Sequence, residues 1–165
     1  MNKYIDLALE MKMIHAKIIT PADIVFDIRT LLKCTWGCEN HDETAYKCRK
    51  HNTSYDERVR MVQAYSQVLL VHSHNDRDVS EAVLEIERQA FLDGYYLAFA
   101  VRFCNYCKTC AVDKDRPCIE PKKVRPCEAI FGIDVYRTAK KFDLPCYPLK
   151  TPDEVQNRYG FVFID

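Results

Sequence analysis

The sequence lacks several features that identify common classes of protein. It contains no Gly-rich phosphate-binding loop, no GxGxxG fingerprint and no pattern typical of a Ser–His–Asp hydrolase. Net charge is also absent, because 24 Lys and Arg residues balance 24 Asp and Glu residues. A chain without net positive charge has no general attraction to polyanions, so we expect no nucleic-acid partner.

Long apolar runs are missing as well. No window reaches the length of a membrane span, and the first residues, with an early Asp6, do not resemble a signal peptide. We therefore expect no membrane association and a cytoplasmic location. The 165 residues fit a single domain, 1–165, whose core is large enough to be stable without disulfides.

What the sequence has in excess is cysteine. In a reducing cytoplasm disulfides are rare, and an odd number of cysteines cannot all be paired, so metal ligation is the better explanation. The cysteines form two groups, at 34–48 and 104–127, on either side of a cysteine-free stretch. The nine residues are Cys34, Cys38, Cys48, Cys104, Cys107, Cys110, Cys118, Cys127 and Cys146.

The second group begins with three cysteines at a spacing of three, Cys104, Cys107 and Cys110, and Cys118 follows after Pro117. Three closely spaced thiolates on one loop suit the iron corners of a 4Fe-4S cluster, and bacterial ferredoxin loops begin in the same way. Structural zinc sites more often use two separated pairs of cysteines. The pattern therefore favours an iron–sulfur cluster on these four thiolates, with zinc as the alternative.

The first group, Cys34, Cys38 and Cys48, is looser and has no fourth cysteine nearby. Three cysteines alone can hold a second cluster with one iron left open to a ligand, as in catalytic metal sites. A fourth ligand can also come from elsewhere in the chain. The candidates are Cys127, Cys146, His41 and His51.

Two roles are possible for Cys127. It precedes a predicted short helix, whose N-terminus would stabilise a thiolate ligand. The alternative is a small buried side chain.

The pattern of apolar residues predicts a mixed α/β domain of the α+β class. We expect a small central sheet flanked by helices, with cysteine-rich metal-binding loops, and the strand–helix–strand unit at 67–103 is its best-defined part. Strands are predicted at 11–19, 68–71, 95–103 and 161–164. Helices are predicted from Pro21 to Cys34, at 55–66, from a capping box at Asp78 to Gly94, at 126–131 and at 133–142.

Three further polar residues can have either a structural or a functional role. Asp134 is expected to cap the helix that follows it, although a carboxylate there can also tune a nearby metal centre. His72 and His74 alternate, which points both to the same face. They can bind metal or carry protons, but we expect them to be polar loop residues at the end of a strand.

The second cysteine group and the residues after it resemble a family of small, cysteine-rich, predicted metal-binding proteins of unknown function. The resemblance spans roughly 30–140 and extends, more weakly, to the first cysteine group. The family usually has Ser at the position of Cys127. Four motifs carry the likeness: Cys104-Asn-Tyr-Cys107-Lys-Thr-Cys110, Arg116-Pro-Cys118-Ile-Glu-Pro121, Arg125-Pro-Cys-Glu128-Ala129 and Gly132-Ile-Asp-Val135. The resemblance implies metal binding, and it implies no particular reaction.

Three functions remain open at this point. The first is an iron–sulfur protein with one or two 4Fe-4S clusters that passes electrons to a redox protein partner. The second is an enzyme that uses an open iron at the first cysteine group as a Lewis acid. The third is an interaction module stabilised by zinc. The sequence favours the first and gives no oligomeric state.

Overall fold

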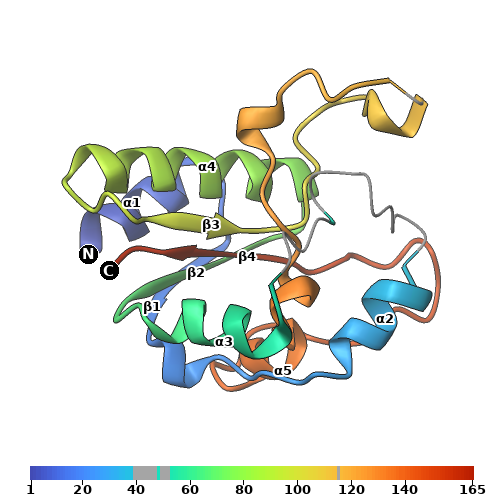
Figure 1. The fold of residues 1–165 in the computed structure, drawn as a ribbon, viewed down its shortest axis with the longest axis horizontal. Coiled ribbons are helices and arrows are strands. Elements are labelled where there is room, and N and C mark those ends of the chain that lie inside the picture. The colour runs from blue at the N-terminus through green and yellow to red at the C-terminus, as the bar shows by residue number, and fades with distance from the viewer. Residues whose placement is uncertain (39–47, 49–52, 115) are drawn as a thin grey trace.

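The structure, a computed structural model, describes residues 1–38, 48, 53–114 and 116–165. It is a small α+β domain in which helices cover both faces of a four-stranded sheet (Figure 1). The helices are α1 (Asn2–Glu10), α2 (Thr30–Trp36), α3 (Tyr55–Gln63), α4 (Asp76–Leu92) and α5 (Val135–Lys140). The strands are β1 (His15–Ile19), β2 (Val68–Ser73), β3 (Phe99–Val101) and β4 (Arg158–Phe163), and short 3-10 helices include η1 (Pro21–Asp23), η3 (Val112–Lys114), η4 (Pro121–Lys123) and η5 (Glu128–Phe131).

The strands lie in the order β1-β2-β4-β3, and every neighbouring pair is antiparallel. Since β2 and β3 both run against β4, they are parallel to each other with β4 between them. The predicted strand–helix–strand unit is therefore present as β2, α4 and β3, but the last strand of the chain is inserted into it. A split unit of this kind brings β4 into the centre of the sheet.

The core has two parts because the central strands are buried on both faces. On β2, Leu69 and Val71 face α1 and α4, whereas Val68 and Leu70 face the opposite layer. This alternation follows from the two-residue period of a strand, and it explains why the sequence of β2 is continuously apolar. Figure 1 shows α1 and α4 on one side of the sheet and α3 and α5 on the other.

Two predicted elements near the N-terminus are wrong in extent. The strand predicted at 11–19 is only His15–Ile19, because Lys12 has a positive φ of 69° in the turn after α1. The helix predicted from Pro21 consists of one 3-10 turn, an extended segment and then α2. The extended segment forms a bridge between Phe26 and Ile133, with an Asp27 N–H to Gly132 carbonyl distance of 2.8 Å. This long-range pairing outweighs the local helical pattern.

The boundaries near α4 and β3 also differ from the prediction. Helix α4 begins at Asp76, because Asn75 rather than Asp78 accepts the capping hydrogen bonds. The strand predicted at 95–103 is confined to Phe99–Val101. The capping box that begins α3 is confirmed, since the Ser54 side chain accepts a hydrogen bond from the Glu57 N–H at 3.2 Å.

Candidate metal centre

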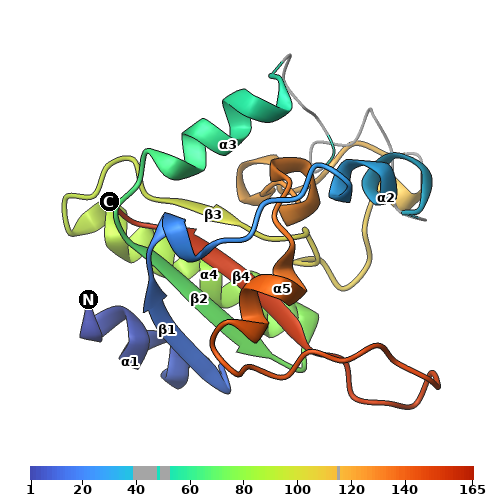
Figure 2. The same cartoon turned by 90° about the horizontal axis from the view of Figure 1, so that it is seen from below.

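The second cysteine group lies on a long excursion of the chain between β3 and η5. We call residues 103–125 the cysteine arm. It projects past the sheet at the end where α4 begins, and both chain termini lie at the opposite end (Figures 1 and 2). The arm is closed at its base by a hydrogen bond of 3.0 Å from the Arg102 N–H to the Pro126 carbonyl. Its two ends are therefore held side by side.

Two thiols of the arm act electrostatically on a third, Cys107. Burial raises the pKa of the Cys107 thiol, and the nearby Cys118 and Cys110 raise it further. Like charges in proximity disfavour ionisation, so these three thiols favour a bound cation. The fourth, Cys104, is half-buried at the base of the arm and lines a small hollow beside Tyr106.

Charged side chains of both signs lie beside this thiol group, since Glu120 and Lys123 both act electrostatically on Cys107 and pair with each other at 3.2 Å. The Lys123 ammonium lies 3.1 Å from the Tyr106 hydroxyl and interacts electrostatically with Cys107. Arg77, in the first turn of α4, also lies within electrostatic range of Cys107 and forms an ion pair with Glu81 at 2.8 Å. Cations beside thiolates offset the negative charge that thiolate ligands bring to a metal site.

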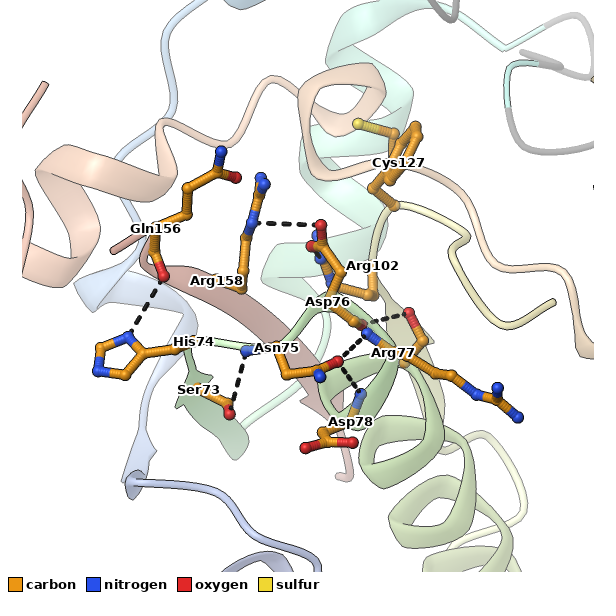
Figure 3. Close-up of polar contacts among 12 residues, drawn as sticks. Ser73, His74, Asn75, Asp76, Arg77, Asp78, Arg102, Cys127, Gln156 and Arg158 are labelled. Carbon is orange, nitrogen blue, oxygen red and sulfur yellow. Dashed lines mark hydrogen bonds and ion pairs between the residues drawn. The ribbon is translucent and has the colours of Figure 1, made fainter. Parts of the chain in front are cut away.

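A buried network of charges supports the base of the arm. The Glu128 carboxylate lies 3.4 Å from the Arg102 guanidinium and 3.2 Å from the Phe103 N–H, and both charged side chains are only 7% exposed. Arg102 also pairs with Asp76, which in turn lies 3.2 Å from Arg158. Figure 3 shows Asp76 between the two arginines, with Cys127 nearby. The network contains two cations and two anions, so its formal charge is balanced.

A second ion pair fixes the C-terminal end of the arm to α4. The Arg125 guanidinium contacts the Glu87 carboxylate, with one N–H to oxygen distance of 2.7 Å. The same carboxylate accepts a hydrogen bond of 2.6 Å from the Ala100 N–H of β3. Glu87 therefore holds the arm itself, and Asp76 holds Arg102 at the base of the arm, from two points of one helix. Neither residue was assigned a role from its position in the sequence.

Cys34, one member of the first cysteine group, lies near Cys127 at the junction of α2, α3 and η5. Cys34 is buried on α2, and Cys127 is the residue that precedes the first turn of η5. Burial raises the pKa of the Cys127 thiol well above its ordinary value, and the adjacent Glu128 and Cys34 raise it further. Cys38 is exposed and Cys48 is half-buried. The structure thus brings together two cysteines that belong to different groups in the sequence.

The remaining candidate ligands are placed differently. Cys146 is half-buried beside Lys140 and Asp134, near α5. His41 and His51 lie outside the described residues. Asp134 caps α5 as expected, since its carboxylate accepts a hydrogen bond of 2.9 Å from the Arg137 N–H.

His72 and His74 only partly match their predicted role. Their rings share one face and meet edge to face at 5.3 Å, as the alternation predicts. His72, however, is a buried residue of β2 and not part of a loop, 1% exposed. Its Nδ1 lies 3.0 Å from the His15 Nδ1, and its Nε2 lies 3.0 Å from the Asn157 Oδ1. Burial lowers the pKa of the His72 imidazole, and His15 and His74 lower it further.

The donor chemistry of these groups fits a thiophilic metal. Thiolates select zinc, copper(I) and iron–sulfur clusters over magnesium or calcium. Among the described residues, no three Cys, His, Asp or Glu side chains converge as ligands of one metal ion. A metal or cluster bound by the arm would thus have to bring its thiols closer together than they are in this structure.

The domain is a small α+β fold with two groups of thiols. These features are typical of proteins that bind metal through cysteine. The comparison with protein families agrees with this class. The chain belongs to the family described as "Predicted metal-binding protein (DUF2284)", whose pattern matches residues 17–164. Comparisons with curated proteins and with solved structures gave no significant match.

No helix within the described part of the chain is both long and apolar enough to cross a membrane. The sequence also gave no role to the charged residues that surround the thiols, among them Arg77, Arg58 and Glu128. Glu128 lies in a motif shared with the family, but neither arginine follows a pattern that marks it, since each approaches the thiols only through packing.

Proposed function

We propose that this protein is an iron–sulfur protein that carries a 4Fe-4S cluster on Cys104, Cys107, Cys110 and Cys118. The observation that supports this most directly is that Cys110 and Cys118 both lie within electrostatic range of Cys107 on a single arm. Three thiols from one short segment suit three iron corners on one face of a cubane. The cluster, when bound, would supply one-electron redox chemistry.

The protein residues around the arm have two functions in this proposal. Arg77 and Lys123 place positive charge beside the thiols, which favours the reduced state of a cluster and raises its potential. The anchors at Glu87 and Glu128 hold the arm in position on the domain. Half-buried thiols keep the site near the surface, where a redox protein partner can approach. We therefore propose electron transfer to such a partner.

The test is metal and sulfide analysis of the full chain purified without oxygen. We expect iron, acid-labile sulfide and the broad visible absorption of a cluster. Cys107→Ala removes one of the proposed ligands and should lower all three signals together, whereas Cys146→Ala serves as the matched control and should leave them unchanged. A colourless protein with stoichiometric zinc, even after reconstitution with iron and sulfide, would refute the proposed cluster and favour the zinc module.

A further inference from the structure

The first cysteine group is accompanied by a buried positive charge. Arg58, on α3, is only 4% exposed, and within the described part of the chain its hydrogen-bond partners are neutral oxygens. Its Nε lies 2.6 Å from the Ile130 carbonyl, and its Nη1 contacts the carbonyl and the hydroxyl of Thr53. Among the described residues it forms no ion pair with a carboxylate. The neighbouring Glu57 instead uses its carboxylate to cap α3 through Ser54.

A buried guanidinium without an anionic partner is unfavourable, because desolvation of the charge is not compensated. Cys34 and Glu57 are the groups that act electrostatically on the Arg58 guanidinium as negative charges. A thiolate at Cys34 would add negative charge beside Arg58. Thiolates persist in a buried position when a metal ligates them.

The elements around Arg58 also bring a second thiol to the same place. The Thr30 hydroxyl, at the start of α2, donates a hydrogen bond of 3.2 Å to the Ala129 carbonyl of η5. Cys34 lies one turn along the same face of α2, and Cys127 lies two residues before Ala129. Cys34 and Cys127 therefore approach each other beside Arg58, and they are close enough to interact electrostatically.

We propose that Cys127 is a ligand of a second metal site, together with Cys34, Cys38 and Cys48, and that Arg58 balances the charge of this site. Cys38 lies two residues past the end of α2 and is exposed, and Cys48 is half-buried. This inference rests on the proposed function for the identity of the metal, a 4Fe-4S cluster, but not for the ligand set. Four thiolates would close the site, which excludes an open iron acting as a Lewis acid there.

The test uses a double-mutant comparison of metal per chain, measured on the full chain purified without oxygen. The variants are Cys107→Ala, Cys127→Ala and the double variant, with Cys146→Ala as the control. If the sites are separate, each single variant loses about half of the metal and the double variant loses nearly all of it, because effects at independent sites add. Cys127→Ser, which retains a small polar residue before η5, should behave like Cys127→Ala if the protein remains folded by circular dichroism.

Two results would overturn the proposal. If Cys127→Ala and Cys127→Ser keep the full metal content, Cys127 is not a ligand. If Cys107→Ala and Cys127→Ala remove the same metal, so that the double variant loses no more than either single variant, Cys127 belongs to the arm. Zinc in place of iron, with the additive pattern retained, would refute the proposed function and leave the ligand assignment of Cys127 supported.

Discussion

Replacing Glu128 with Gln removes one charge from the buried network at the base of the arm. The Glu128 carboxylate and the Arg102 guanidinium are 3.4 Å apart and 7% exposed. At an effective dielectric constant of about 20, their attraction is about 5 kcal/mol. Part of this is offset because a buried carboxylate no longer has to be desolvated, and the Gln amide oxygen can still accept from the Phe103 N–H. We therefore expect Glu128→Gln to lower the free energy of unfolding by about 2–4 kcal/mol.

The assay is urea unfolding followed by circular dichroism, with the same metal content in each sample. Glu85→Gln is the matched control, because Glu85 also pairs with an arginine, at 2.8 Å, but its side chain is 37% exposed. An exposed pair of this kind contributes at most about 1 kcal/mol. If Glu128→Gln destabilises the protein no more than Glu85→Gln does, the network does not stabilise the base of the arm and the reasoning is wrong.

Three further substitutions test separate parts of the structure. Gly132 has a φ of 75°, and a Cβ there would clash with the Tyr55 ring of α3, so Gly132→Ala should lower the free energy of unfolding in urea by about 2–4 kcal/mol. Gly94 has a φ of 100° but open space around it, so Gly94→Ala should lower this free energy by only about 1–2 kcal/mol. The pKa of His72 is lowered by burial, so the unfolded chain binds more protons just below pH 6.5; the free energy of unfolding should therefore fall as the pH drops below 6.5, and His72→Gln should reduce this slope. If the arm carries the proposed cluster, removing the positive charge of Arg77 should make its reduction potential more negative by voltammetry. Arg88→Gln, on the same helix, should not change this potential, and equal potentials for Arg77→Gln and Arg88→Gln would contradict the proposed effect.

The sequence predicts best those features that depend on neighbouring residues. The start of α3 is correct because its capping box involves only Ser54 and Glu57. The helix predicted after Pro21 is wrong because the conformation of this segment is decided by the bridge from Phe26 to Ile133, which is far along the chain. The burial of His72 could not be predicted for the same reason, since its partners come from other strands and loops.

The same distinction applies to the candidate site. The spacing of Cys104, Cys107 and Cys110 is local, so the sequence alone could predict that these thiols are neighbours. The approach of Cys127 to Cys34 depends on how α2 packs against η5, which no spacing in the sequence encodes. For the first cysteine group the sequence therefore left several possible fourth ligands, and the packing of α2 against η5 is what supports the proposal of Cys127.

The adjacency of Cys127 and Glu128 connects the base of the arm with Cys34. Glu128 accepts a hydrogen bond from Phe103, the residue before Cys104, whereas Cys127 lies beside Cys34. The Cys127 thiol also contacts the Glu128 carboxylate, at 3.6 Å. The apolar clusters on both faces of the sheet contain no cysteine among the described residues. The start of η5 is therefore where the base of the arm and Cys34 are closest in structure, the first through Glu128 and the second through Cys127.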